Sequence, residues 1–161
     1  MKVFDSLKKK AEESKKVIVF PEGNDDRIIK AAVRLEKEGI VKPLLLGKPD
    51  EVIKTAQSLN VDLGSIEIIN PAVYPDFEKM CQDFVELRKG KNTLAEAKEI
   101  LQDVSYFGTM LVYEGKADGM VSGATHSTAN TVRPALQIIK TKKGMSRVSG
   151  AMIMERGDEK Y

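Results

Sequence analysis

The stretch GMVSGATHSTANTVRPALQIIK, from Gly119 to Lys140, decides the fold. It passes from a short apolar segment through a loop of Gly, His, Ser, Thr and Asn into an amphipathic helical pattern. We predict a helix that begins near residues 127–130, with its unpaired N–H groups and the positive end of its dipole directed at the loop. A phosphate would be stabilised there. Arg133, in or near the first turn, offers a planar guanidinium that matches phosphate oxygens.

The same pattern has a simpler explanation, because a strand, a glycine-containing loop and a helix form a common unit in α/β proteins. Ser127 and Thr128 could offer hydroxyl groups to a phosphate, or they could cap the helix. His126 is the only histidine. It is either a functional residue at the mouth of the loop or a hydrogen-bonded structural residue. The residues alone leave these alternatives open.

Strands and helices alternate along the chain before this stretch. The predicted elements are strands at residues 17–20, 43–46, 66–69 and 120–122, and helices over residues 26–38, 50–59, 76–89, 93–102 and 105–115. Short connections between them favour a parallel sheet with right-handed crossovers and helices on both faces. The sequence therefore predicts an α/β fold with three layers, α/β/α, and a mostly parallel sheet.

Capping residues mark several of these helix ends. Asn24 or Asp25 can cap the helix over 26–38, and Gly39 can end it. Thr93 with Glu96 forms a possible capping box. These positions give predicted boundaries that a structure can test.

The two ends of the chain carry weaker patterns. Phe4 and Leu7, together with Val3, lie on one side of a charged helix over residues 2–14, which we expect to pack as an outer helix. Residues 146–155 predict one more strand, and residues 158–161 the start of a returning strand whose hydrogen-bond partner is missing.

Composition excludes several classes of protein. Hydrophobic residues at 42% and charged residues at 31% describe an ordinary globular protein, and a net charge of +2 is too balanced to favour nucleic acid or an anionic membrane as partner. With one histidine and one cysteine, Cys81, the chain cannot form a His/Cys zinc site or an internal disulfide. No apolar run suits a signal peptide or a membrane span, so we expect a cytoplasmic protein with no metal.

Four segments closely resemble phosphate acetyltransferases (phosphotransacetylases), in the same order and spacing. They are IVFPEGNDDR at Ile18–Arg27, ELRKGKN at Glu86–Asn92, YFGTMLVYEGKADGMVSG at Tyr106–Gly123 and SGATHSTANTVRPALQIIKT at Ser122–Thr141. The resemblance covers essentially the whole chain, although proteins of this family are about twice as long. It implies an isocitrate dehydrogenase-like fold that is incomplete here. We expect an N-terminal α/β domain at residues 1–142, and a linker with the first strand of a truncated second domain at 143–161.

The resemblance also implies which residues bind the anionic substrates. The arginines of the ELRK and VRP segments serve this role in the family, and Arg88 and Arg133 occupy those positions. From its place in the PEGNDDR loop, Arg27 is either a third cation at the carboxyl edge of the sheet or the ion-pair partner of a nearby carboxylate. With His126, Ser127 and Thr128, these residues form the predicted phosphate site.

The implied reaction is acetyl-CoA + phosphate ⇌ coenzyme A + acetyl phosphate. Coenzyme A is a substrate, and no covalently bound cofactor is expected. In the family a catalytic aspartate comes from a C-terminal segment without counterpart in this sequence, so no catalytic residue is assigned. We expect the chain to supply the anion-binding half of the site, to be inactive alone and to form a homodimer when full length. The alternatives are a phosphate butyryltransferase-type enzyme and a non-catalytic phosphate-binding α/β module.

Overall fold

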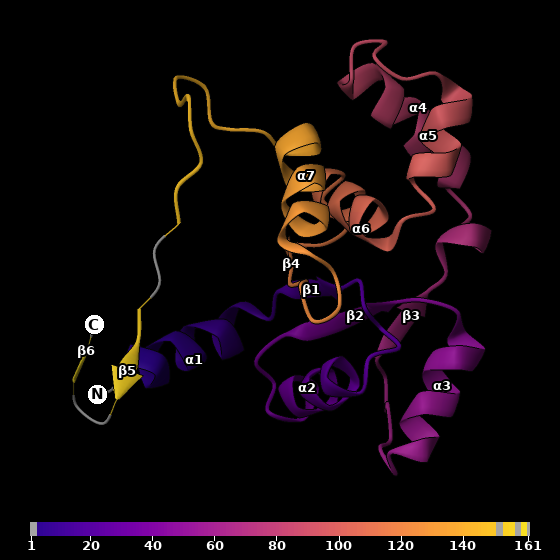
Figure 1. Cartoon of the computed structure of the whole chain (residues 1–161). Coiled ribbons are helices and arrows are strands. Elements are labelled where there is room, and N and C mark those ends of the chain that lie inside the picture. The colour runs from indigo at the N-terminus through magenta and orange to yellow at the C-terminus, as the bar shows by residue number, and fades with distance from the viewer. Residues whose placement is uncertain (1–2, 151–152, 157–158, 161) are drawn as a thin grey trace.

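The computed structural model describes residues 3–150, 153–156 and 159–160 of the chain. Its centre is a four-stranded sheet in the order β3-β2-β1-β4, in which every pair is parallel (Figure 1). The strands are β1 (Val17–Phe20), β2 (Lys42–Leu46), β3 (Glu67–Ile69) and β4 (Gly119–Met120). The helices are α1 (Val3–Ser14), α2 (Asp26–Lys37), α3 (Pro49–Ser58), η1 (Pro71–Val73), α4 (Phe77–Leu87), α5 (Leu94–Ile100), α6 (Val104–Tyr113) and α7 (Thr128–Ile138).

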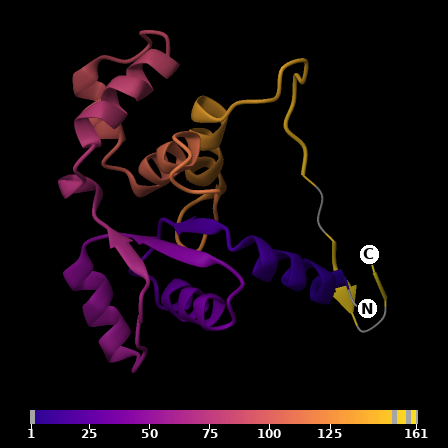
Figure 2. The ribbon, with the colours of Figure 1, turned by 180° about the vertical axis from the view of Figure 1, so that it is seen from behind.

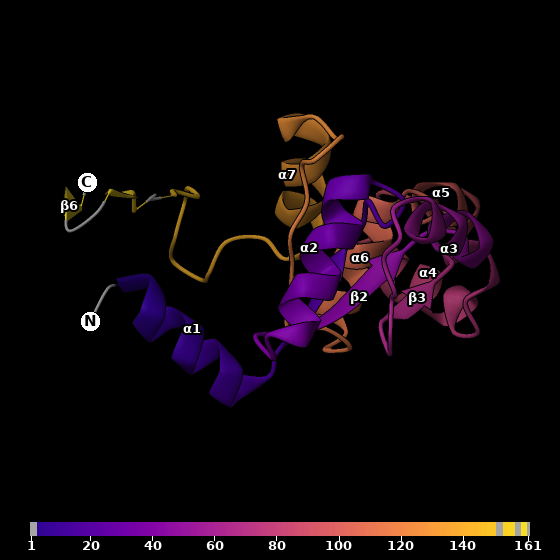
Figure 3. The ribbon, with the colours of Figure 1, turned by 90° about the horizontal axis from the view of Figure 1, so that it is seen from below.

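The sheet is covered on both faces, because successive side chains of a strand point to opposite sides. Val19 and Leu46 lie in one buried cluster with side chains from α4, α5, α6 and α7. Phe20 and Leu45 lie in the other with side chains from α2 and α3. Figures 1 and 2 show the two helical layers on either side of the sheet, and Figure 3 looks onto the α2 side. The predicted three-layer α/β/α fold is therefore confirmed.

The predicted caps explain where several helices begin. The Asp25 carboxylate accepts hydrogen bonds from the N–H groups of Arg27 and Ile28 at the start of α2. Thr93 and Glu96 form the reciprocal capping box of α5. The Ser127 hydroxyl accepts from the N–H of Asn130 and so starts α7. These three boundaries agree with the sequence prediction.

Gly108 lets α6 lie directly against the sheet. A Cβ atom at this position would lie 2.9 Å from Sδ of Met120, 3.1 Å from Cγ1 of Val19 and 3.2 Å from Cδ1 of Leu46. We expect Gly108→Ala to lower the free energy of unfolding by about 1 kcal/mol, because overpacking costs roughly 1–3 kcal/mol and alanine regains about 1 kcal/mol of helix propensity. Urea denaturation would measure this. Gly150→Ala, where no atom lies within 4 Å of the new Cβ, should leave the midpoint unchanged.

Helix α1 packs only in part as the outer helix predicted. Phe4 and Leu7 are 52% and 50% exposed, and they line a surface pocket together with Ala31, Leu35 and Ile40 of the α2 region. Figure 1 shows α1 extending away from the sheet, and an ion pair of 2.7 Å between Lys8 and Glu38 ties it to the end of α2. The charged residues of α1 therefore contribute to its placement, which the apolar pattern did not indicate.

The strand predicted at 146–155 is also wrong in most of its length. Residues 146–150 and 153–154 form no ladder, because the segment leaves the body after α7 and no neighbouring strand lies beside it in the described part of the chain. β5 (Glu155–Arg156) pairs antiparallel with β6 (Glu159–Lys160). The expected returning strand is present at 159–160 and pairs with residues 155–156, so the prediction that its hydrogen-bond partner is missing was wrong. Residues 158 and 161 lie outside the described residues. The domain division at residue 142 stays a prediction.

Candidate anion-binding site

Two loops meet at the carboxyl ends of the neighbouring strands β1 and β4. One comprises residues 21–25 and leads into α2; the other comprises residues 121–127 and leads into α7. From β1 the chain proceeds through β2 to β3 on one side of the sheet, while β4 returns to its other side. Open α/β sheets bind their ligands at such a switch point, outside the carboxyl ends of the strands. The two loops therefore occupy the position where a ligand site is expected.

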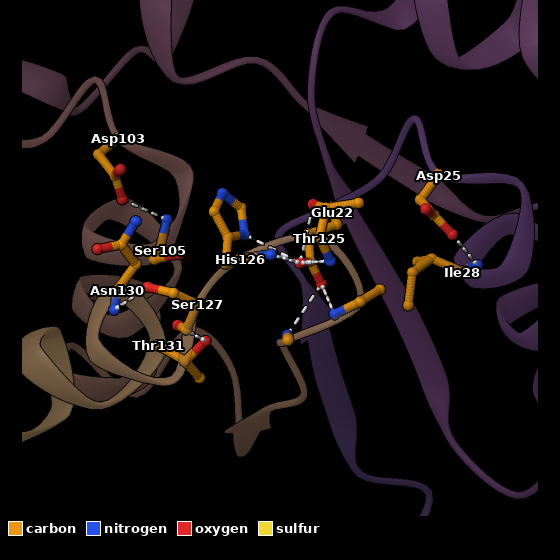
Figure 4. Close-up of polar contacts among 12 residues, drawn as sticks. Glu22, Asp25, Ile28, Asp103, Ser105, Thr125, His126, Ser127, Asn130 and Thr131 are labelled. Carbon is orange, nitrogen blue, oxygen red and sulfur yellow. Dashed lines mark hydrogen bonds and ion pairs between the residues drawn. The ribbon is translucent and has the colours of Figure 1, made fainter.

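Glu22 fills the space between these loops with its own carboxylate. Its Oε2 accepts hydrogen bonds from the N–H groups of Gly123 at 3.0 Å and Ala124 at 2.9 Å. Its Oε1 accepts from the N–H groups of Thr125 at 2.6 Å and His126 at 2.8 Å, and from the Thr125 hydroxyl at 3.0 Å. Figure 4 shows this convergence. Consecutive backbone N–H groups that surround an anion in this way form a nest.

The charge of Glu22 is stabilised by its surroundings. The residue is only 3% exposed, and burial alone would raise its pKa. The backbone N–H groups of Thr125, His126 and Ala124 and the Thr125 hydroxyl outweigh that effect and lower the pKa of Glu22 to about 2. At neutral pH the nest is therefore occupied by a permanent negative charge of the protein.

Arg27 contacts the same loop from another direction. Its guanidinium donates to both carboxylate oxygens of Asp25, at 3.0 and 2.8 Å, and to the backbone carbonyl of Ala124 at 2.7 Å. The pairing with Asp25 was one of the two alternatives left open by the sequence. Arg27 thus joins the β1–α2 loop to the β4–α7 loop, and a role in binding substrate stays a prediction.

His126, Ser127 and Thr128 lie at the start of α7 but have different surroundings. Ser127 uses its hydroxyl as the cap of the helix, whereas Thr128 is an exposed residue of the first turn. Nδ1 of His126 lies 3.0 Å from Oε1 of Glu22, within ion-pair distance, although the ring does not align an N–H bond with that oxygen. Ser127 is therefore placed as a capping residue, and His126 as a neighbour of the buried carboxylate.

Arg88 and Arg133 lie near one tyrosine of α6. Arg88 is half-buried at the end of α4, with its Nε 3.4 Å from Oδ1 of Asn92, and Arg133 is exposed in the second turn of α7. Burial raises the pKa of the Tyr106 phenol, and the positive charge of Arg133 opposes this, as does that of Arg88 to a smaller extent. The Tyr106 hydroxyl donates to Oε1 of Gln137 at 3.0 Å. The structure therefore brings both arginines within electrostatic reach of one side chain.

A cleft of about 380 Å³ lies at the carboxyl edge of the sheet. His126 lines it, whereas the other predicted site residues do not. Its remaining lining comes from the ends of several elements: Pro21, Glu22, Asn24, Leu46, Gly47, Lys48, Glu51, Asn70, Pro71, Ala72, Gln102, Val104 and Thr125. Arg88 and Arg133 thus share an electrostatic effect on Tyr106. Arg27 contacts the loop of residues 121–127 and His126 adjoins Glu22, whereas Ser127 and Thr128 begin α7.

The described residues contain neither a cluster of metal-binding side chains nor a membrane-spanning helix. In this part of the chain, no three or more His, Cys, Asp or Glu side chains are grouped so as to hold a metal ion. None of the helices described has both the length and the apolar character needed to cross a membrane.

A family model described as phosphate acetyl/butaryl transferase matches residues 2–161. The chain belongs to this family. The phosphate acetyltransferase of Staphylococcus aureus (strain MRSA252) is 56% identical over 144 residues, which are 89% of this chain and 44% of the relative. That of Bacillus subtilis (strain 168) is 49% identical over 159 residues, 99% of this chain and 49% of the relative. The chain spans about half the length of these family members.

Solved structures of the same family share the fold. A phosphotransacetylase from Streptococcus pyogenes superimposes with a TM-score of 0.94 at 52% identity, covering 100% of this chain and 50% of the other. A phosphotransacetylase from Staphylococcus aureus gives a TM-score of 0.91 at 54% identity, covering 98% and 48%. The resemblance recognised in the sequence is therefore confirmed.

Proposed function

We propose that this chain supplies the anion-binding half of a phosphate acetyltransferase site, for the reaction acetyl-CoA + phosphate ⇌ coenzyme A + acetyl phosphate. The observation that carries the proposal is the family match over residues 2–161. The charges of Arg88 and Arg133, which come from two different helices and both act on the Tyr106 phenol, support it. Two guanidinium groups on rigid elements suit a phosphate dianion, since each offers a fork of charge-assisted donors. The names of the relatives support acetyl phosphate as substrate.

The chemistry we propose is a direct transfer. The thiolate of coenzyme A attacks the carbonyl carbon of acetyl phosphate, the carbonyl–phosphate C–O bond breaks, and phosphate leaves with that electron pair. Arg88 and Arg133 would stabilise the phosphate charge as it develops. Cys81 is a poor acyl carrier, because it is fully buried and burial raises the pKa of its thiol. The base that deprotonates coenzyme A would come from the other half of the enzyme.

The remaining partners follow from the same proposal. The full-length enzyme would act in the cytoplasm as a homodimer on coenzyme A, phosphate and acetyl phosphate. The near-neutral charge of this chain and its single cysteine support small-molecule substrates in a reducing compartment.

Complementation tests the proposed function. The purified chain is assayed for acetyl-CoA formation from acetyl phosphate and coenzyme A, alone and after addition of the C-terminal half of the Streptococcus pyogenes relative. We expect no turnover above background for either half, and turnover when they are mixed. Butyryl phosphate, run in parallel, should react more slowly than acetyl phosphate. Turnover by the chain alone would contradict the half-site. A preference for butyryl phosphate would favour a butyryltransferase-type enzyme.

A further inference from the structure

We propose that Glu22 is a positioning residue whose carboxylate acts as a built-in anion, filling the nest of residues 123–126 and directing phosphate to the arginine pair instead. The first part of this inference stands on hydrogen bonds of the chain itself. The second part, the direction of phosphate to Arg88 and Arg133, rests on the proposed function.

The nest has no donor left for a substrate. The N–H groups of Gly123, Ala124, Thr125 and His126 all donate to Glu22, and the Thr125 hydroxyl adds a fifth hydrogen bond. A carboxylate offers about four lone-pair sites, so these donors saturate it. A phosphate could enter only by displacing Glu22. That would leave a charge 3% exposed without its partners, which is strongly unfavourable.

The position of this loop sets the position of α7. Residue 126 is followed at once by Ser127, the cap of α7, and the helix then carries Arg133 as a rigid element. Arg27 holds the carbonyl side of the loop at Ala124, so the loop is fixed through both its N–H and its C=O groups. A shift of the loop would therefore move Arg133 relative to Tyr106 on α6.

A role for Glu22 as a proton acceptor is disfavoured by the same contacts. A general base needs a free lone pair and a pKa near the working pH. Glu22 accepts five hydrogen bonds, and its pKa is about 2. Its contacts fit the fixing of a loop better than proton transfer.

The test uses the whole chain, Glu22→Ala and, as matched control, Glu99→Ala, which removes an exposed glutamate of α5. Acetate is the probe, because its methyl and carboxylate groups match the atoms removed from Glu22. In Glu22→Ala we expect acetate to bind saturably, to return the amide proton shifts of residues 123–126 toward those of wild type, and to restore phosphate affinity. Without acetate that affinity should be about tenfold or more below wild type, comparable to losing one charged contact. Chloride at equal ionic strength should not substitute.

Wild-type protein provides a second measurement if Glu22→Ala does not fold. Scalar couplings across hydrogen bonds should connect the Glu22 carboxyl carbon with the amide nitrogens of residues 123–126. Added phosphate should shift the Nε signals of Arg88 and Arg133 but not those four amides. Missing couplings, phosphate-induced shifts at residues 123–126, or acetate binding to Glu99→Ala equal to that of Glu22→Ala would each overturn the inference. If the couplings to Glu22 are present but phosphate shifts neither arginine signal, the role of Glu22 as a built-in anion stands and the proposed function is contradicted.

Discussion

Replacing both Arg88 and Arg133 with alanine is expected to weaken phosphate binding by about 100-fold or more. Each charge-assisted hydrogen bond contributes roughly 1.5–3 kcal/mol, and 1.4 kcal/mol corresponds to a factor of about ten, so each single variant should lose about tenfold or more. The two losses should multiply if the side chains bind phosphate independently. Isothermal titration of the chain with inorganic phosphate would measure the three affinities, and the complementation assay would give the matching change in turnover.

Two further variants define what the arginine pair contributes. Arg34→Ala removes an exposed arginine that pairs with Glu38 at the end of α2. Because α2 and α7 lie on opposite faces of the sheet, this variant should leave phosphate affinity unchanged. Arg133→Lys keeps the charge but not the planar fork, so its affinity should lie between those of wild type and Arg133→Ala. Equal affinity for wild type and the double variant would place the phosphate site elsewhere on the chain.

Acidification is expected to remove about 3 kcal/mol of stability through Glu22 alone. Its pKa in the folded chain, about 2, lies below the ordinary value of 4.5 that applies after unfolding. The unfolded chain therefore binds the proton first as the pH falls. The contribution is fully present above about pH 5 and is lost as the pH falls toward 2, at about 1.36 kcal/mol for each pKa unit.

A comparison of variants isolates this contribution. The pKa values of Asp25 and Glu38 are also lowered to about 2, through hydrogen bonds with Arg27 and with Arg34, so the whole chain loses stability in acid for several reasons. Glu22→Gln removes the titrating group but not the others. The difference between wild type and Glu22→Gln in urea unfolding should be largest at pH 6 and shrink as the pH falls to 3. Parallel curves over this range would contradict the assignment.

The charge of the neighbouring Arg27 does not change over this pH range, because its hydrogen bond with Asp25 raises the pKa of the guanidinium. The difference between the two unfolding curves therefore reports on position 22.

Local patterns in the sequence were sufficient to predict most elements of the fold. Local patterns of this kind involve neighbours only a few residues apart, as in the apolar run at 17–20 and the apolar stripe of the helix after Asp25. Capping by Thr93 and Ser127 likewise involves the backbone N–H of a residue three positions later. The strand predicted at 146–155 was wrong because its formation depends on distant residues. An apolar pattern forms a strand only where a neighbouring strand is free to pair with it, and no local pattern in the sequence indicates that.

The same limit applies to the site. The sequence pattern predicted that the backbone N–H groups beside α7 would face a phosphate. Glu22 was then only one of the nearby carboxylates, with Asp25 and Asp26, that could pair with Arg27. The hydrogen bonds of Glu22 span 101 to 104 residues of sequence, which no periodicity can indicate. One signal was present: an acidic residue between Pro21 and Gly23, immediately after a buried strand, opposite a loop of small residues. Arg88 and Arg133 came from family resemblance, and their binding role stays a prediction.

The two sides of the contact between Glu22 and the loop of residues 123–126 should differ in how many substitutions they tolerate. On the loop side, four of the five hydrogen bonds come from main-chain N–H groups, which every residue except proline possesses. Ala124 can therefore accept many side chains without losing its hydrogen bond, whereas Gly123, at φ +112°, is limited by its backbone conformation. At position 22, the interaction depends on a carboxylate held away from the backbone by the length of a glutamate side chain. We therefore expect a saturation library to tolerate many residues at position 124 and almost none but glutamate at position 22.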